Sequence, residues 1–239
     1  MMDVWFIRHG ECTANIGDAT SSAHEAHLTA RGWQEAYAIA DYLSHLPEHK
    51  LTRIISSPYI RARQTALATQ DMLGVKNVET LPVQEFNYLA LPNRVSTTSA
   101  QRSPLVKDYW ERCKPFYRHR DKAESFADFI DRVQNVLNKL QGQKYKEDML
   151  IVVFSHHQFM LAIRWLLERE GEIHPGNLRS SEMREFYAFA KNGPIPNGAI
   201  VKTALSQNEY HLWPEIEISH LHNQVEVSPL SDKALQTCP

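Results

Sequence analysis

Two histidines and two arginines follow apolar stretches of this chain at positions where strands are expected to end. Arg8 and His9 follow the apolar run VWFI, and His156 follows MLIVVFS. Arg61 comes shortly after a third run, RIIS. Ligands of layered α/β folds bind at the carboxyl ends of the parallel strands, so we expect these four side chains to converge at one edge of a sheet.

This set of side chains is suited to binding an anion, in particular a phosphoryl group. Arginine's planar fork matches phosphate oxygens, and each charge-assisted hydrogen bond contributes roughly 1.5–3 kcal/mol. A neutral imidazole can attack phosphorus as a covalent nucleophile, while a second, protonated imidazole can stabilise the equatorial oxygens. The leaving oxygen would still need a proton from a carboxylic acid. The pattern therefore predicts phosphoryl-transfer chemistry.

A metal centre is the other chemistry that the histidines allow. The chain has three closely spaced histidine pairs: His24 and His27, His156 and His157, and His220 and His222. Carboxylates and cysteines at ligand spacing are missing, and adjacent histidines rarely chelate one ion well. The neighbouring arginines would also repel a cation. We therefore expect neither a metal ion nor a cofactor.

Composition and charge limit the classes of partner. The formal net charge is −2 and the pI is about 6.6, so no overall field attracts nucleic acid or a membrane surface. Cys12, Cys113 and Cys238 are widely spaced, which indicates a reducing compartment. The N-terminus lacks the build of a signal peptide, and no apolar run approaches membrane-spanning length. We expect a cytoplasmic protein that binds a small phosphorylated substrate or a phosphoprotein. These features leave its oligomeric state open.

Hydrophobic patterning predicts alternating strands and helices, and hence a three-layer α/β/α sandwich with a mostly parallel central sheet. The run at 149–155 is apolar on both faces, which favours a central strand. The expected strands are 3–7, 53–57, 75–83, 149–155, 198–205 and 209–213. The expected helices are 28–46 with Thr29 as N-cap, a helix from Ser57-Pro58 to Gly74, 125–140 opening on a Ser125–Asp128 capping box, and 156–168.

Residues 1–225 are expected to form one domain, with 86–122 as an inserted cap and 226–239 as a flexible tail. The cap segment holds an aromatic set that could line a substrate cleft or form a small satellite core. Its arginines are expected to form a solvated face, although one could steer an acidic substrate. The aromatic set is Phe86, Tyr88, Tyr109, Trp110, Phe116 and Tyr117, and the arginines are Arg102, Arg112, Arg118 and Arg120.

Several motifs, in order along the chain, resemble those of the histidine phosphatase superfamily, which includes cofactor-dependent phosphoglycerate mutases. The resemblance runs from about residue 3 to about residue 205. The motifs are Arg8-His9-Gly10-Glu11 with Asn15; Leu28-Thr29, Gly32 and Glu35-Ala36; Ser56-Ser57-Pro58 with Arg61-Ala62 and Gln64-Thr65; Glu124-Ser125-Phe126; Ser155-His156; and Asn197-Gly198-Ala199. The resemblance implies that His9 is the phosphorylated nucleophile and that Arg8, Arg61 and His156 hold the phosphoryl group.

Two departures from the family pattern affect the expected site. His157 stands where the family usually has glycine; it could reach the pocket mouth and contact substrate, although packing under the cap is the plainer expectation. Glu85 matches the family's proton donor but lacks the glycine that often follows it, so it could also be an ordinary loop charge. Asn15 is assigned to substrate binding, together with His157.

The arginine-rich substrate segments typical of mutases are not evident between 86 and 122, which favours hydrolysis of a phosphomonoester. A mutase that depends on a bisphosphorylated primer and a phospho-ligand binding protein without turnover are the two alternatives.

Overall fold

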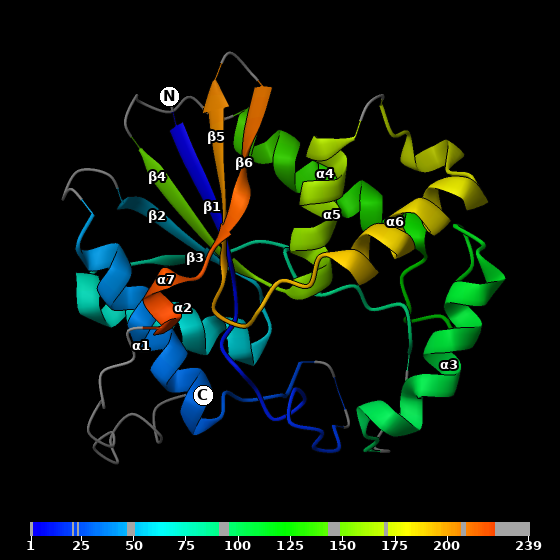
Figure 1. The fold of residues 1–239 in the computed structure, drawn as a ribbon, viewed down its shortest axis with the longest axis horizontal. Coiled ribbons are helices and arrows are strands. Elements are labelled where there is room, and N and C mark those ends of the chain that lie inside the picture. Colours follow the sequence, from blue (N-terminus) through cyan, green and yellow to red (C-terminus); the bar gives the residue numbers. More distant parts are fainter. Residues whose placement is uncertain are drawn as a thin grey trace.

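The computed structural model describes residues 2–20, 22, 24–46, 51–90, 96–142, 149–169, 172–206 and 209–222. Within them, six strands form one mixed sheet in the order β3-β2-β4-β1-β5-β6 (Figure 1). The strands are β1 (Met2–Arg8), β2 (Leu51–Ser56), β3 (Val78–Thr80), β4 (Leu150–Ser155), β5 (Ile200–Ser206) and β6 (Glu209–Glu217). Strands β1 to β4 pair in parallel, while β5 and β6 extend the sheet antiparallel. The predicted central position of β4 is confirmed.

Helices cover both faces of this sheet (Figure 1). The helices are α1 (Ala30–Ser44), α2 (Ile60–Leu73), α3 (Ser99–Arg112), α4 (Phe126–Gln141), α5 (His157–Glu168), the short 3₁₀ turn η1 (Pro175–Asn177), α6 (Ser180–Asn192) and α7 (Ser219–His222). Alternate residues of β1 pack on opposite sides: Val4 and Phe6 join the core under α4, α5 and α6, whereas Trp5 and Ile7 join the core under α1 and α2. The predicted three-layer α/β/α sandwich is confirmed. No helix among the described residues has the length and apolar character needed to cross a membrane.

Local capping agrees with the sequence at three helix ends. Thr29 caps α1 by accepting a hydrogen bond from the Gly32 N–H, and Gly74 ends α2 in the left-handed conformation. Ser125 and Asp128 form the expected capping box of α4. These caps fix the ends of helices that flank the carboxyl edge of the sheet.

Two predicted boundaries are wrong. Helix α2 begins at Ile60 rather than at Ser57-Pro58, because the Ser57 hydroxyl accepts from the Tyr59 N–H and also bonds to His156. Strand β3 covers only Val78–Thr80, a small part of the 75–83 that was expected, because pairing with β2 stops where β2 ends. Helices α3 and α6 were not predicted as complete elements.

The aromatic side chains of the cap segment mostly join the main core. Phe86 stacks on Phe129 at a centroid distance of 4.3 Å, and Tyr109 and Trp110 are buried with them. Phe116, by contrast, is largely exposed. The division into a 1–225 domain with an 86–122 insertion stays a prediction, and residues 226–239 lie outside the described residues.

Candidate active site

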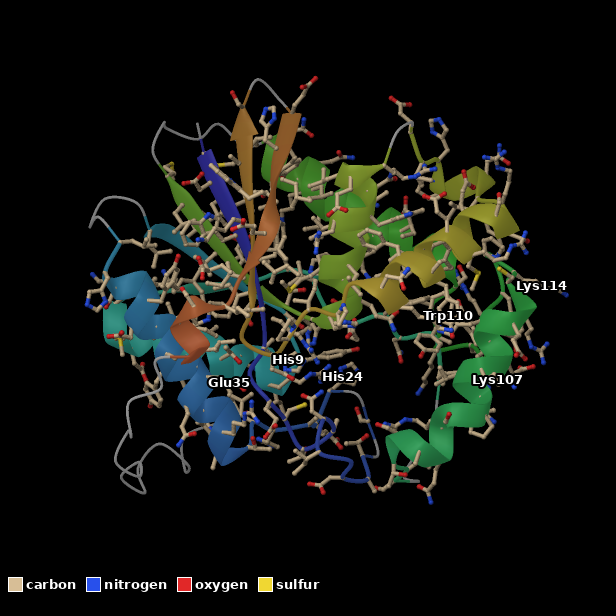
Figure 2. All side chains as sticks on the ribbon, viewed as in Figure 1. His9, His24, Glu35, Lys107, Trp110 and Lys114 are labelled. Atoms are coloured by element: carbon tan, nitrogen blue, oxygen red, sulfur yellow. The ribbon has the colours of Figure 1, made fainter. Side chains whose placement is uncertain are left out.

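A cavity of about 540 Å³ opens where the parallel strands end. The pairing of β1 with β4 sets Arg8 beside Ser155, so the residues that follow the two strands, His9 and His156, leave the sheet side by side. Their ring centroids are 5.1 Å apart. The cavity is lined on the sheet side by Arg8, His9 and Arg61. Figure 2 shows His9 at this edge of the sheet, with His24 close to it.

His9 is held as a neutral imidazole with one nitrogen turned toward Arg61. Its Nδ1–H donates to the Gly10 carbonyl at 2.7 Å, and its Nε2 accepts from the Arg61 Nε–H at 3.0 Å. An arginine nitrogen can only donate, so Nε2 carries the lone pair. Burial, followed by the charges of Arg61 and Arg8, lowers the pKa of His9 well below its ordinary value. Nε2 is therefore unprotonated at neutral pH, and it can act as a nucleophile when the Arg61 N–H turns to a phosphoryl oxygen.

His156 is fully buried as the N-cap residue of α5. Its Nε2 lies 2.8 Å from the Ser57 hydroxyl, which itself accepts from the Tyr59 N–H. The Ser57 O–H can then donate to Nε2, which leaves the ring proton of His156 on Nδ1. Burial, then the charges of Arg61 and His9, lower the pKa of His156 well below its ordinary value. The protonated state expected for the second histidine stays a prediction, and the N–H of a neutral imidazole can also donate a hydrogen bond to a phosphoryl oxygen.

The two arginines bring positive charge to the cavity from two different strand ends. Arg8 at the end of β1 donates from Nη1 to the Ile195 carbonyl at 2.6 Å. Arg61 is in the first turn of α2, with its guanidinium 5.0 Å from the centre of the Tyr59 ring. Burial lowers the pKa of both guanidinium groups. The ordinary pKa of arginine is so high that both groups still carry their charge at neutral pH. The expected convergence of Arg8, His9, Arg61 and His156 is found.

Two glycines let the loop after β1 lie against the start of α1. A Cβ on Gly32 would lie 1.9 Å from the Glu11 carbonyl oxygen, and one on Gly10 would lie 2.4 Å from the Gly32 carbonyl oxygen. The Glu11 N–H donates to the buried Glu35 carboxylate at 2.7 Å. This contact between two backbones fixes the direction in which His9 leaves the strand.

Asn15 lines the cavity, but its side-chain oxygen is engaged within the protein. It accepts from the Cys12 N–H at 3.0 Å and from the Asn197 amide at 3.3 Å. Asn197 also donates to the His9 carbonyl at 3.0 Å. The side chain thus joins the loop after β1 to the turn before β5, and substrate binding by Asn15 stays a prediction.

Glu85 lines the same cavity, and its carboxylate is tied to the start of α5. Its Oε1 accepts from the Phe86 N–H at 3.1 Å and from the Gln158 N–H at 2.9 Å. One carboxylate oxygen is therefore fixed by backbone donors, which orients the group toward the cavity that it shares with His9. His157 lies half-buried at the first position of α5, outside the cavity lining. Its assignment to substrate binding stays a prediction.

An ion pair that the sequence did not reveal holds the segment carrying Glu85. Arg132 of α4 binds the Glu124 carboxylate at 2.6 and 2.9 Å through Nε and Nη2. It also donates to the carbonyls of Pro82, Gln84 and Glu85, at 2.9, 2.9 and 3.4 Å. The second Glu124 oxygen accepts from the Asn87 N–H at 3.1 Å. In the sequence, Glu124 and Arg132 are eight residues apart on either side of a helix start, and this spacing alone does not predict an ion pair.

The closely spaced histidines do not assemble a metal centre in the described part of the chain, where no three His, Cys, Asp or Glu side chains lie close enough to hold an ion. His27 Nδ1 instead bonds to the Gln64 amide at 3.1 Å. His220 donates to the Gly198 carbonyl at 2.9 Å, and the edge of His24 packs on the Tyr59 ring.

Comparison with known proteins agrees with this geometry. The model of the histidine phosphatase superfamily, branch 1, matches residues 4–185. This chain belongs to the histidine phosphatase superfamily. The resemblance seen in the sequence is thus confirmed.

Relatives of this histidine phosphatase superfamily member are named for different activities. A probable phosphoglycerate mutase, GpmB, of Yersinia enterocolitica is 31% identical over 94 residues, which is 39% of this chain and 42% of that protein. The chain therefore matches less than half the length of this curated relative. Among solved structures, a mycobacterial glucosyl-3-phosphoglycerate phosphatase has a TM-score of 0.65 with 19% identity, covering 89% of this chain and 97% of that one.

A putative alpha-ribazole-5'-P phosphatase from Escherichia coli has a TM-score of 0.59 with 22% identity, covering 89% of this chain and 94% of that one. At these identities the two structures show a shared fold. Membership of the superfamily supports a phosphatase or phosphotransferase enzyme.

Proposed function

We propose that this protein is a phosphatase that hydrolyses a phosphomonoester through a covalent phosphohistidine, without a metal ion. The observation that carries the proposal is the state of His9. Its Nε2 lone pair accepts the N–H of Arg61 beside a cavity that Arg8 and Arg61 make positive, and its Nδ1–H is fixed on the Gly10 carbonyl. Such an imidazole is a nucleophile placed beside groups that neutralise a phosphoryl dianion.

The reaction has two steps. Nε2 of His9 forms a bond to phosphorus while the bond from phosphorus to the leaving oxygen breaks, and Glu85 transfers a proton to that oxygen. Water then attacks the phosphohistidine, with the Glu85 carboxylate accepting a proton from the water, and phosphate leaves. Arg8, Arg61 and an N–H of His156 stabilise the charge on the equatorial oxygens in both steps.

The name of the Yersinia relative favours a mutase as the second candidate. A mutase returns the phosphoryl group to the same substrate, so it must hold its intermediate and exclude water. The arginine-rich substrate segments typical of mutases are not evident between 86 and 122, and this supports hydrolysis. A mutase would show dependence on a bisphosphorylated primer and an isomerised product.

The substrate is expected to be a small phosphorylated molecule or a phosphoprotein. The thiols of Cys12 and Cys113 are free, which supports a reducing compartment such as the cytoplasm.

Hydrolysis of p-nitrophenyl phosphate in the presence of EDTA tests the proposal. Wild type is compared with His9→Ala and with His174→Ala, whose imidazole lies on the surface with its side chain 75% exposed. We expect turnover in wild type and His174→Ala, none in His9→Ala, and an acid-labile phosphoryl label on His9 after rapid quenching. Activity that survives His9→Ala, or that needs an added divalent metal, would contradict the mechanism. Phosphate binding without turnover of any ester would favour a binding protein.

A further inference from the structure

A short helix near the end of the described chain contacts the turn that holds the nucleophile. Helix α7 follows β6 and packs beside α1 (Figure 1). The residues that match the family model, 4–185, end before this helix. One of its side chains, His220, is only 7% exposed and reaches the main chain of Gly198. The mechanism proposed above assigns no role to this buried imidazole.

The turn at 196–199, which leads into β5, carries the main chain of the nucleophile. The Gly198 N–H donates to the carbonyls of Arg8 and His9, at 3.2 and 3.3 Å. The Arg8 N–H donates in return to the Ala199 carbonyl at 3.0 Å. The Asn197 amide adds a bond to the His9 carbonyl at 3.0 Å. The position of His9 therefore depends on the conformation of this turn.

Gly198 gives the turn a conformation that other residues rarely adopt. Its φ is +72°, and a Cβ there would lie 2.8 Å from Leu221 Cδ2. Glycine has more conformational freedom than any other residue, so bonds from outside the turn have to keep it in one conformation. Within the turn, the Ala199 N–H lies 3.3 Å from the Pro196 carbonyl oxygen, which is a long hydrogen bond.

His220 supplies a bond from outside the turn. Its Nε2 lies 2.9 Å from the Gly198 carbonyl oxygen. A carbonyl oxygen only accepts, so Nε2 carries a proton and donates it. The main chain of Gly198 is thus bonded on both sides: its N–H binds the nucleophile's loop, and its carbonyl binds His220. The second bond restricts rotation about Gly198 and so fixes the direction of the first.

His220 is itself held by a network at the base of α7. The ring of Tyr42 in α1 lies 5.2 Å from the His220 ring, measured between centroids. Glu217 accepts from the Ser219 N–H at 2.8 Å and from Lys202 Nζ at 3.0 Å. Hydrogen bonds from Ser219 lower the pKa of Glu217 to about 2, so the carboxylate is charged at neutral pH. These contacts tie α7 to α1, β5 and β6.

We propose that His220 is a positioning residue for the nucleophile, because its bond to the Gly198 carbonyl keeps the turn at 196–199 in the conformation that holds His9 in place. This inference rests on the proposed phosphatase function and adds a residue that does not line the cavity. Attack on phosphorus requires the reacting atoms to be aligned, and a displacement of about 1 Å can cost about 10²-fold in rate. A small rotation of the turn would therefore reach the reaction through His9.

Two variants at this position separate the hydrogen bond from the packing. Glutamine can place an amide N–H near the position of Nε2, whereas leucine fills the space without a donor. In His220→Leu we expect the rate constant for phosphorylation of His9, measured by rapid quenching of the acid-labile label, to fall by about 10- to 100-fold. His220→Gln should restore most of this rate. The Kd of inorganic phosphate, measured by calorimetry, should stay close to wild type in both, because Arg61 and His156 hold phosphate from other elements.

Two control variants separate positioning from other effects of substitution. His211→Leu removes an exposed imidazole from β6 and should leave the phosphorylation rate unchanged. Leu140→Ala opens a cavity in the last turn of α4, so it should lower the melting temperature without contacting the turn at 196–199. At a temperature where it is folded, Leu140→Ala should phosphorylate His9 at the wild-type rate.

Hydrogen exchange of the Gly198 amide, followed by NMR, tests the contact without any catalysis. We expect this N–H to exchange faster in His220→Leu than in wild type or His220→Gln. An equal exchange rate in wild type and His220→Leu would overturn the inference, as would a phosphorylation rate that falls no further in His220→Leu than in Leu140→Ala. A wild type that hydrolyses no ester would instead refute the proposed phosphatase function, and the exchange rates would still decide whether His220 holds the turn.

Discussion

Arg132 is expected to act on catalysis by positioning Glu85, and Arg132→Met tests this role. The guanidinium makes two hydrogen bonds to the Glu124 carboxylate and three to backbone carbonyls, with lengths from 2.6 to 3.4 Å. The three carbonyls belong to Pro82, Gln84 and Glu85. Methionine keeps most of the apolar stem, makes none of these bonds, and removes the guanidinium that lies over the rings of Phe129 and Phe159. The segment carrying Glu85 would then lose its hydrogen bonds to α4 and keep the stacking of Phe86 on Phe129.

The magnitudes follow from burial. The side chains of Arg132 and Glu124 are 12% and 22% exposed. Removing one partner of a fully buried ion pair costs about 3–5 kcal/mol, so we expect a loss of about 2–3 kcal/mol of unfolding free energy for this partly exposed pair. A proton donor contributes about 10²–10⁴ in rate, and a misplacement of about 1 Å can cost about 10²-fold.

The assay that separates positioning from stability is the dependence of rate on the leaving group. An alkyl phosphate needs a proton on its leaving oxygen, whereas p-nitrophenolate leaves with little help. In Arg132→Met we therefore expect kcat for an alkyl phosphate to fall by about 10² and kcat for p-nitrophenyl phosphate to fall by less than about fivefold. Both rates are measured at a temperature where circular dichroism shows the variant to be folded.

Arg118→Met is the matched control, because Arg118 makes a two-bond pair with Asp128 at 2.8 and 2.7 Å on the exposed side of the same helix start. It should leave the leaving-group dependence unchanged. An equal loss on both substrates in Arg132→Met would refute the positioning role. If Glu85→Gln likewise lowers both rates equally, Glu85 is not the acid.

Three further predictions concern the strand-end side of the cavity. Burial and the neighbouring arginines lower the pKa of His9 and of His156 below 6.5, so the unfolded chain binds more protons than the folded protein below that pH. The free energy of unfolding, measured by chemical denaturation, should therefore fall as the pH drops below about 6.5. In a pH-rate profile, the acid limb of kcat/KM should lie below about 6.5. Gly32→Ala places a Cβ 1.9 Å from the Glu11 carbonyl oxygen, so it should lower the free energy of unfolding by roughly 1–3 kcal/mol and reduce activity. Gly176→Ala, whose Cβ meets no atom within 4 Å, should change neither stability nor activity. Equal melting temperatures for the two variants would contradict the packing argument. Ser57→Ala removes the hydroxyl that bonds to His156 Nε2, so it should lower the free energy of unfolding by about 1–3 kcal/mol and lower kcat. Ser44→Ala, on the exposed end of α1, should change neither quantity. Thermal melts and steady-state kinetics measure both effects.

The sheet and the strand-end side of the site were predictable because their signals are local. Each apolar run ends at a polar residue, and the rule that ligands bind at the carboxyl ends of parallel strands then places Arg8 and His156 together. The caps at Thr29 and Ser125 are likewise local, since the side chain and the N–H that it accepts from lie three residues apart. Ser57 shows the limit of such signals, because a distant His156 uses the hydroxyl that local rules assign to a helix cap.

The opposite wall of the cavity depends on contacts that no local pattern specifies. Helix α3 buries only Tyr109 and Trp110, so its sequence has little hydrophobic periodicity. It is placed by pairing of Thr97 with Thr20, by the bonds of Arg102, and by aromatic packing on Phe86. Each of these joins segments far apart in the chain. Arg102 therefore reads in the sequence as one of several solvated arginines, although the fold places it at the cavity.

This difference between the two walls suits a family in which one reaction serves many substrates. The strand-end wall is built from backbone register and two glycine contacts, so a change there moves His9 and stops the reaction. The wall from α3 and the segment after it meets the rest of the protein through side chains, so substitutions there can alter charge and shape while the nucleophile stays in place. In this chain Arg102 and Lys122 are among the residues of that wall, so substitutions there are expected to change which leaving groups the cavity accepts while His9 keeps its position.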